Sequence, residues 1–289
     1  MIRIIYLDID GTLRDEVTGI SARTKAALQQ CQSTGIQVVA CTGRSPDCIQ
    51  EDVLALGLDG VISGGGCYIR YQNEPLFSRH LPPMIVEQFL TYASIYQLGI
   101  SLELEQGIYM NAGMADFYKA DLHKKFSGYS SMDITELLRR HKLCYQDTIT
   151  RYRPDRDLIH KICVIGEHDR LKKLQNQLAD SIQIVQDQAW DEKWYLECLP
   201  TGCSKGTAVE WLNQFLHIPR EYSMSFGDGG NDIDLLQAAG IGVAVEGGDP
   251  RLLRLADSVC EPPAMDGIYK ELARRNIILS RLERGVLYG

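Results

Sequence analysis

Short apolar runs alternate with polar, helix-like segments at the beginning of the chain. Residues 2–7 form one such run and residues 36–41 another, both rich in β-branched side chains. A run that is apolar on both faces predicts a strand covered on both sides, as in a parallel sheet. Between the two runs, Ser21 predicts a helix N-cap and Gly35 a C-terminal stop. The pattern therefore predicts a strand, a helix and a strand in succession, with a further strand and a hairpin behind them.

A different pattern begins at Pro82-Pro83. Residues 84–97 predict an amphipathic helix, and residues 100–104 alternate between apolar and polar side chains, as in a strand with one exposed face. The order of predicted helices and strands then stays irregular over the middle of the chain. This contrast predicts a separate α+β insert.

The alternation of strands and helices resumes after the insert. Ser204 predicts the start of a helix that runs to about Phe215, and short strands and helices follow it. Such an order in both flanks predicts an α/β fold with a Rossmann-like, doubly wound parallel sheet. We therefore predict a core formed by residues 1–80 and 190–289, with an α+β domain inserted at 81–189.

Composition and charge narrow the possible functions. The chain has 289 residues, which suggests about two domains, and its 30 basic against 38 acidic residues give a formal charge of −8. Such a chain lacks the broad positive field of non-specific nucleic-acid binding. Its apolar runs are far shorter than the ~20 residues of a membrane span, so neither nucleic acid nor a membrane is an expected partner.

Cysteine usage and the N-terminus bear on location. The chain has nine cysteines, an odd number without a Cys-x-x-Cys pair, and several lie in apolar runs. This predicts buried free thiols in a reducing compartment. Asp8 and Asp10 would interrupt the apolar segment of a secretory signal. A cytoplasmic location is therefore expected.

Two carboxylates follow the first predicted strand, in the sequence Asp8-Ile9-Asp10-Gly11-Thr12. An apolar strand has no structural need for two acids at its end, and their proximity raises the free energy of both. A divalent cation would relieve this repulsion, and oxygen ligands suit magnesium. One carboxyl could then stay ionised while the other carries a proton. An acidic turn without chemistry is the alternative.

Two further candidates lie at predicted strand ends or helix starts, where ligands bind in open α/β sheets. Thr42-Gly43 follows the second strand, and a hydroxyl with free N–H groups at a helix N-terminus can bind an anion. Lys205 begins a predicted helix, where its charge opposes the helix dipole and an anionic partner would explain it. A capping threonine and a solvated lysine are the alternatives.

A glycine-rich loop supplies the fourth candidate. Gly227 to Asp232 lies between a predicted strand and a helix, with Asp228, Asn231 and Asp232 as oxygen donors. Glycines allow a backbone to approach a ligand closely. A tight turn capped by its own side chains is the alternative.

Taken in this order, the four motifs resemble the haloacid dehalogenase superfamily of phosphohydrolases. The insert between Thr42 and Lys205 is similar in position to the large α/β cap of the Cof-type phosphatases. Gly202-Cys203-Ser204-Lys205-Gly206 and Met265-Asp266-Gly267-Ile268 also resemble that subgroup. The resemblance covers the whole chain.

The resemblance implies a role for each candidate. Asp8 would be the nucleophile that forms an aspartyl-phosphate, and Asp10 the acid and base for the leaving group and for water. Magnesium would bind Asp8, the main-chain carbonyl of Asp10 and Asp228, with Asp232 in support. The phosphate-binding residues would be Thr42, Gly43, Lys205 and Asn231.

The implied function is removal of phosphate from small phosphorylated metabolites such as sugar phosphates. Two departures from the family, at Gly65 and Glu246, lie outside the reaction core and leave the substrate open. A phosphomutase, or a phosphatase of a flavin or pyridoxal cofactor, would share the fold. A phospho-acceptor signalling protein is disfavoured by Asp10, and an inactive binding protein by the presence of all four motifs.

Overall fold

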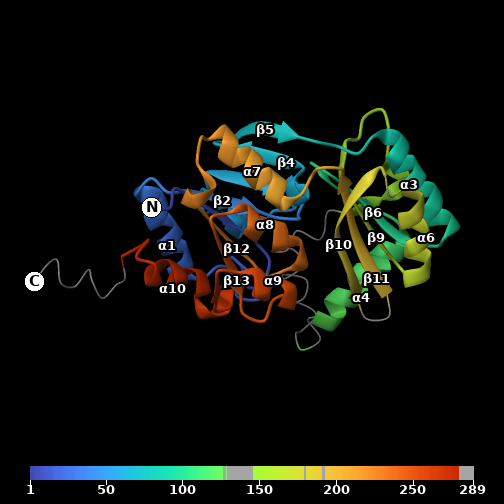
Figure 1. Ribbon diagram of the computed structural model, residues 1–289. Coiled ribbons are helices and arrows are strands. Elements are labelled where there is room, and N and C mark those ends of the chain that lie inside the picture. Colours follow the sequence, from blue (N-terminus) through green and yellow to red (C-terminus); the bar gives the residue numbers. More distant parts are fainter. Residues whose placement is uncertain (126–127, 129–145, 179, 191–192, 280–289) are drawn as a thin grey trace, which may run out of the picture.

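The computed structural model describes residues 1–125, 128, 146–178, 180–190 and 193–279. Among these residues the chain forms two sheets, each packed against helices, which lie side by side (Figure 1). The N-terminal and C-terminal parts of the chain together form one of them, and the middle of the chain forms the other. An insert in a two-part core is therefore what the structure contains.

The core sheet has eight strands, which in spatial order are β14 (Ser258–Cys260), β13 (Ile241–Val245), β12 (Ser223–Gly227), β1 (Ile4–Leu7), β2 (Gln37–Cys41), β3 (Gly60–Ser63), β4 (Tyr68–Tyr71) and β5 (Glu74–Ser78). The strands from β14 to β3 pair in parallel, whereas β4 and β5 are antiparallel to their neighbours. The predicted α/β fold with a Rossmann-like sheet is thus confirmed, with an antiparallel hairpin at one edge.

Helices cover both faces of this sheet, as its doubly apolar strands require. On β1, Ile5 and Leu7 belong to the apolar cluster of one face, and Ile4 and Tyr6 to the cluster of the other. Alternate side chains of a strand point to opposite faces, so an all-apolar strand needs both covered. One face packs on α1 (Ala22–Ser33) and α10 (Gly267–Arg274). The other packs on α7 (Lys205–Phe215), α8 (Ile233–Ala238) and α9 (Pro250–Leu255).

Local capping signals explain where the core helices begin. The Ser21 side chain accepts a hydrogen bond from the Thr24 N–H and caps α1, as predicted. After β2 the chain forms a single 3₁₀ turn at Pro46–Cys48, with the proline in its first turn, and the short helix α2 (Glu51–Leu54) follows.

The second sheet, which we call the cap sheet, has six strands, which in spatial order are β10 (Ile182–Trp190), β11 (Lys193–Pro200), β9 (Ile159–Gly166), β6 (Gly99–Leu104), β7 (Gly107–Met110) and β8 (Gln146–Thr148). Its pairs are antiparallel except for β7 with β8. Helices α3 (Pro83–Ile95) and α6 (His168–Leu178) pack on the face away from the core (Figure 1). Helix α4 (Ala112–Lys125) contacts β6.

The insert ends later than the sequence predicts. Residue 189, its predicted last residue, lies inside the hairpin of β10 and β11, and β11 also pairs with β9. The boundary therefore falls after Pro200. The strand from Tyr195 to Leu199 is apolar enough to be taken for a core strand, and only its pairing assigns it to the cap sheet.

Two smaller expectations can also be compared with the structure. Eight cysteines are described, and all are buried free thiols; Cys144 lies outside the described residues. Among the described residues, no helix combines the length and apolar composition that crossing a bilayer demands.

Candidate active site

The predicted site residues meet at the carboxyl edge of neighbouring core strands. Asp8 follows β1, Thr42 follows β2 and Asp228 follows β12, and β1 pairs with both of the other two strands. Lys205 is the first residue of α7, whose N-cap is Ser204. Three parallel strands and one helix therefore bring distant parts of the sequence to one point.

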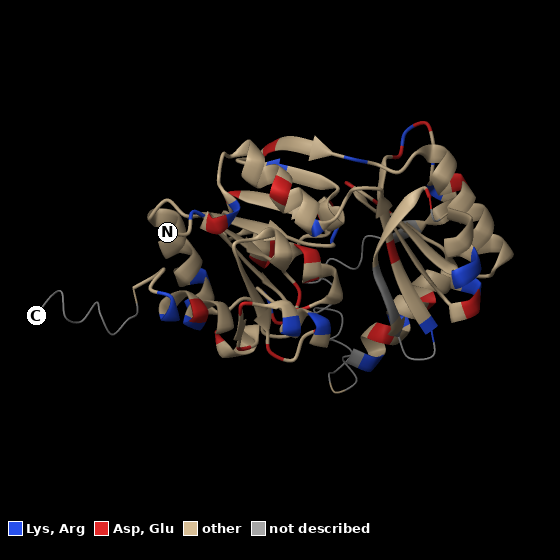
Figure 2. Ribbon diagram, viewed as in Figure 1, with Lys and Arg blue, Asp and Glu red and all other residues tan. Residues whose placement is uncertain are grey.

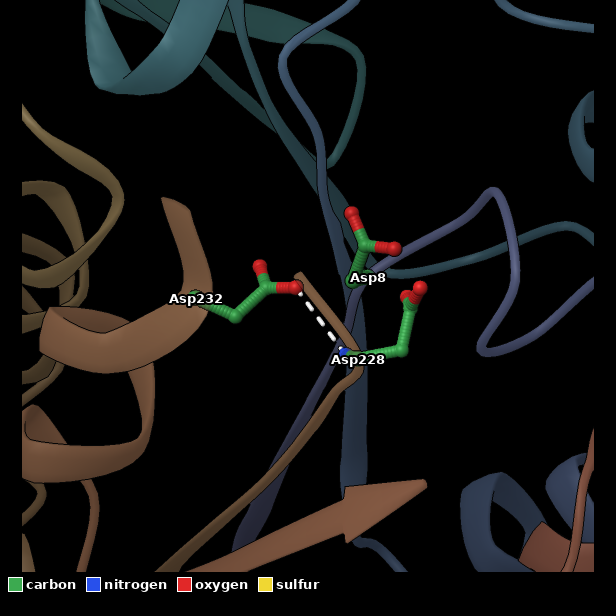
Figure 3. Close-up of side chains that lie close together, drawn as sticks. All are labelled: Asp8, Asp228 and Asp232. Atoms are coloured by element: carbon green, nitrogen blue, oxygen red, sulfur yellow. Dashed lines mark hydrogen bonds between the residues drawn. The ribbon is translucent and has the colours of Figure 1, made fainter. Parts of the chain in front are cut away.

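Three carboxylates form the centre of this site. One oxygen of each of Asp8, Asp228 and Asp232 lies within 4.8 Å of the others. The Asp8 and Asp228 carboxylates lie beside each other, while Asp232 turns toward the backbone of Asp228 (Figure 3). Lys205 Nζ donates to Asp8 Oδ1 and to Asp232 Oδ1, at 2.6 Å each. The charge that opposes the helix dipole at Lys205 is thus matched by two anions.

Asp232 supports the loop that carries Asp228. Its Oδ2 accepts hydrogen bonds from the backbone N–H groups of Asp228, at 3.1 Å, and of Gly229, at 2.9 Å. Both of its oxygens are therefore engaged, one by the loop and one by Lys205. This agrees with the supporting role implied for Asp232, which itself stays a prediction.

Gly11 and Thr12, in the loop that follows β1, also hold the Asp228 carboxylate in place. Thr12 Oγ1 donates to Asp228 Oδ1 at 2.7 Å. Gly11 has φ +87°, and a Cβ there would lie 2.6 Å from Asp228 Oδ2. A side chain at this position would both strain the backbone and displace the carboxylate. The close approach of Asp228, which follows the neighbouring strand β12, thus explains why position 11 is a glycine.

Burial leaves this centre with excess negative charge. Three carboxylates and the single ammonium of Lys205 sum to −2. Burial raises the pKa of Asp8 well above its ordinary value; Lys205 lowers it, and the carboxylates of Asp232 and Asp228 raise it further. Burial and Asp232 raise the pKa of Asp228 to about 6. A buried set of oxygen donors with uncompensated charge fits a hard divalent cation, so this cluster could hold one.

Asp10 lies at the rim of the site and is held by two residues that the sequence reading missed. Arg44 donates to both carboxylate oxygens of Asp10, and Gln50 Nε2 donates to Oδ1 at 2.8 Å. An arginine paired through two N–H groups fixes a carboxylate in direction as well as in position. Arg44 directly follows the Thr42-Gly43 pair singled out in the sequence, so its neighbours were predicted but its role was not.

The predicted phosphate-binding residues are also brought together. Thr42 Oγ1 accepts a hydrogen bond from the Arg44 N–H at 3.1 Å, the local capping that was the alternative for this threonine. Gly43 and Asn231 are neighbours: a Cβ on Gly43 would lie 3.8 Å from Asn231 Nδ2. Contact with phosphate stays a prediction for both, as it does for Thr42 and Lys205.

Of the two departures from the family pattern, Gly65 contacts residues of this site and Glu246 is exposed. Gly65 has φ +67°, and its N–H donates to the Thr42 carbonyl at 3.1 Å, so it supports the loop. A Cβ there would lie 3.0 Å from Leu199 Cδ1 of the cap sheet. Glu246 is exposed after β13. Only the first departure therefore affects how core and cap meet.

Residues of the cap sheet also reach the site. Lys161 Nζ donates to the Gly43 carbonyl at 2.7 Å, and Glu103 Oε2 accepts from Ser45 Oγ at 3.0 Å. Sequence reading missed both. The available signal was a charged residue within an otherwise apolar strand, in His160-Lys161-Ile162-Cys163 and Ser101-Leu102-Glu103-Leu104. Figure 2 shows charged residues on the strands of the cap sheet as well as on its outer helices.

Comparison with known proteins agrees with this geometry. A family model described as haloacid dehalogenase-like hydrolase matches residues 5–272. The chain belongs to the haloacid dehalogenase-like hydrolases. The resemblance predicted from the four motifs, with its Cof-type subgroup, is confirmed.

Individual relatives give this hydrolase its enzyme class. The HMP-PP phosphatase of Serratia proteamaculans is 30% identical over 266 residues, which cover 88% of each chain. A haloacid dehalogenase-like hydrolase from B. subtilis superimposes with a TM-score of 0.79 at 20% identity, over 96% of this chain and 100% of the other. The HAD subclass IIB sugar phosphatase BT4131 does so with a TM-score of 0.75 at 21% identity, with the same coverage. The predicted class, phosphatase, is confirmed.

Proposed function

We propose that this phosphatase is a magnesium-dependent phosphomonoesterase that acts on small phosphorylated metabolites through an aspartyl-phosphate at Asp8. The observation that carries the proposal is the cluster of buried Asp8 and Asp232, both bonded to Lys205, with the half-buried Asp228 beside them. A fold gains little from gathering three carboxylates around one buried lysine, because desolvation offsets most of the attraction. A site for a cation and a phosphoryl group explains the arrangement.

The cation fits the carboxylate pair of Asp8 and Asp228, whose pKa values are both raised where they lie. Asp8 and Asp228 would hold it, together with the Asp10 carbonyl, and Asp232 would keep Asp228 in place. Bound there, magnesium would supply positive charge for the phosphoryl oxygens. The hard oxygen donor set suits this ion.

The protein side chains divide the reaction between them. Asp8 would attack phosphorus, with Lys205 holding a phosphoryl oxygen and lowering the pKa of Asp8 against the effect of burial. Asp10 would give a proton to the departing alkoxide and later take one from water. Its hydrogen bonds with Arg44 and Gln50 would orient its carboxyl group at the rim of the site. Thr42, Gly43 and Asn231 would complete the phosphate contacts.

The cap would select the substrate. Its sheet touches the core at Gly43 and Ser45, next to the predicted phosphate-binding residue Thr42, and from there it would cover the site. A cover of this kind excludes water and contacts the part of the substrate that does not react. The relatives named above act, by their names, on HMP-PP and on sugar phosphates. We therefore place this chain's substrate among small phosphate esters of that size.

The deciding experiment looks for the covalent intermediate. Purified protein is mixed with magnesium and p-nitrophenyl phosphate, quenched with acid within one turnover, digested, and mapped by mass spectrometry. We expect phosphate on the Asp8 peptide, more of it in Asp10→Asn, and none in Asp8→Asn. Hydrolysis without phosphate on Asp8 in either the wild type or Asp10→Asn would contradict the proposed mechanism.

A further inference from the structure

The cap sheet presents a buried ion cluster to the core. On β6 and β9, Glu103 and Lys161 are direct cross-strand partners. Glu197 on β11 lies opposite Cys163, which is two residues from Lys161 along β9. Lys161 Nζ lies 3.1 Å from Glu197 Oε1 and 3.4 Å from Glu103 Oε2. None of the three side chains is more than 10% exposed. Two buried carboxylates thus share one ammonium, which leaves a formal charge of −1.

The two carboxylates of this cluster are satisfied to different extents. Glu103 uses both oxygens: Oε2 accepts from Ser45 Oγ at 3.0 Å, and Oε1 accepts from the Cys163 thiol at 3.2 Å. Glu197 Oε1 accepts from Lys161 and, at 3.3 Å, from the Tyr195 hydroxyl. Glu197 Oε2 is buried and has no hydrogen-bond partner among the described residues. A buried ionised oxygen without a donor is a costly exception in a folded protein.

This unpartnered oxygen faces the candidate active site. A Cβ on Gly43 would lie 3.7 Å from Glu197 Oε2, 3.7 Å from Lys161 Nζ and 3.8 Å from Asn231 Nδ2. Gly43 follows Thr42, and Asn231 lies in the loop of Asp228. The oxygen therefore lies where the cap sheet meets two of the predicted phosphate-binding residues, Gly43 and Asn231.

Resting on the proposed function, we propose that Glu197 selects the substrate: its Oε2 accepts a hydrogen bond from a hydroxyl or ammonium group on the part of the ester that does not react. The class of substrate is then a phosphate ester of a polyol or amino sugar, and esters with a carboxylate at that place are rejected. A substrate donor would satisfy the oxygen that the protein leaves without one. An ammonium would also neutralise the cluster's remaining charge.

A site built around a buried acceptor discriminates strongly, because an analogue without the donor leaves the acceptor unpaired. Glu197→Gln keeps the shape and an acceptor oxygen but removes the charge. Its effect should therefore depend on the charge of the substrate. A hydrogen bond to a charged group is worth enough to give about 10- to 100-fold in kcat/KM.

The test compares three 6-phosphate esters, of glucosamine, glucose and gluconate, which carry an ammonium, hydroxyls and a carboxylate. We expect Glu197→Gln to lower kcat/KM for glucosamine 6-phosphate by about 10- to 100-fold and for glucose 6-phosphate by a smaller factor. It should raise kcat/KM for 6-phosphogluconate, a gain that partial unfolding cannot produce. Asp169→Asn, at a 94% exposed carboxylate of the same cap, is the matched control and should leave the order of the three esters as it is.

p-Nitrophenyl phosphate separates failure of this inference from failure of the proposed function. If the wild type hydrolyses none of the four esters, the proposed function fails and this assignment with it. If the wild type hydrolyses the aryl ester, the assignment alone is overturned by any of three results. These are no activity on the three sugar esters, a preference for 6-phosphogluconate, or equal ratios among the three in wild type and Glu197→Gln.

Discussion

The core and the cap each bury one lysine between two carboxylates, and the two clusters differ in what remains unsatisfied. In the core, Lys205 joins Asp8 and Asp232, and the extra carboxylate of Asp228 leaves net negative charge. In the cap, Lys161 joins Glu103 and Glu197, and a single oxygen of Glu197 is left without a donor. The core cluster thus lacks positive charge to balance its carboxylates, whereas the cap cluster lacks a hydrogen-bond donor for one oxygen.

This difference indicates which part of a substrate each cluster would meet. A shortage of positive charge suits a metal ion and a phosphoryl group. A missing donor suits the hydroxyl or ammonium groups of an organic leaving group. Buried ion pairs contribute little net stability, so neither cluster is explained by folding alone. Under the proposed function, the two shortages would mark the two halves of one substrate site, across the junction at Gly43.

Replacing the nucleophile should have the largest effect. Asp8→Asn is expected to lower kcat/KM by roughly 10⁴-fold or more for every ester alike, because no covalent intermediate can form. Stability in EDTA at pH 7 should not fall, since the pKa of Asp8 is raised and its charge is unfavourable where it lies. Steady-state kinetics and thermal melting measure the two effects. If the loss of kcat/KM depended on the leaving group, Asp8 would contact the leaving group, the role expected for the cap cluster, and would not be the nucleophile.

Removing the cation should come next. Excess EDTA is expected to abolish activity and magnesium to restore it. Asp228→Asn should lower kcat by roughly 10²–10³-fold, the range for loss of one preorganised electrostatic group. A magnesium titration should also show weaker apparent binding in this variant. Glu197→Gln is the matched carboxylate change in the cap and should leave the magnesium dependence as in the wild type; full activity in EDTA would refute the assignment.

The cap lysine should matter for folding more than for metal binding. Lys161→Met leaves Glu103 and Glu197 buried without their cation, which is expected to destabilise the protein by about 3–5 kcal/mol. Denaturant unfolding with and without magnesium measures the change. The triple change with Glu103→Gln and Glu197→Gln should recover much of the stability, because no buried charge then remains unpaired. No recovery would show that Lys161 acts through packing alone.

The pH dependence of stability should separate the core cluster from the rest of the molecule. The pKa of Asp228 is raised to about 6, mainly by burial, so the folded state binds more protons than the unfolded state between about pH 4 and 6. Its contribution to stability is therefore greatest at low pH and is lost as pH rises through about 6. In EDTA the wild type should lose up to about 3 kcal/mol relative to Asp228→Asn between pH 4 and 7. Magnesium should remove this difference in slope.

Much of the core, but little of the cap, could be predicted from sequence. Asp8, Lys205 and Asp228 follow or precede regular elements with clear signals, and parallel strands bring their carboxyl ends to one edge. The insert could be located by its change of pattern at Pro82-Pro83. Its end could not, because strand β11 reads like a core strand until its pairing is known.

The missed residues share a physical reason. Lys161 and Glu197 are charged residues within largely apolar strands, and sequence alone does not say which face of these strands meets the core. The residues of this cluster come from three antiparallel strands, β6, β9 and β11. The register between these strands cannot be predicted from the sequence of any one of them. Arg44 directly follows a recognised motif, but its partner Asp10 lies 34 residues away.

That pairing gives the smallest expected effect. Arg44 donates from two nitrogens to the two oxygens of Asp10, and a lysine cannot reproduce this fork. Arg44→Lys should lower kcat about 10-fold for alkyl phosphates, whose leaving group needs the Asp10 proton. For p-nitrophenyl phosphate, whose leaving group needs none, the loss should stay within about twofold. Gln50→Leu, which removes the single bond at 2.8 Å, should act in the same direction but less. Equal losses of kcat on both kinds of ester would mean that Arg44 acts by contacting the phosphate and not by orienting Asp10. Arg44 would then be one of the phosphate-binding residues.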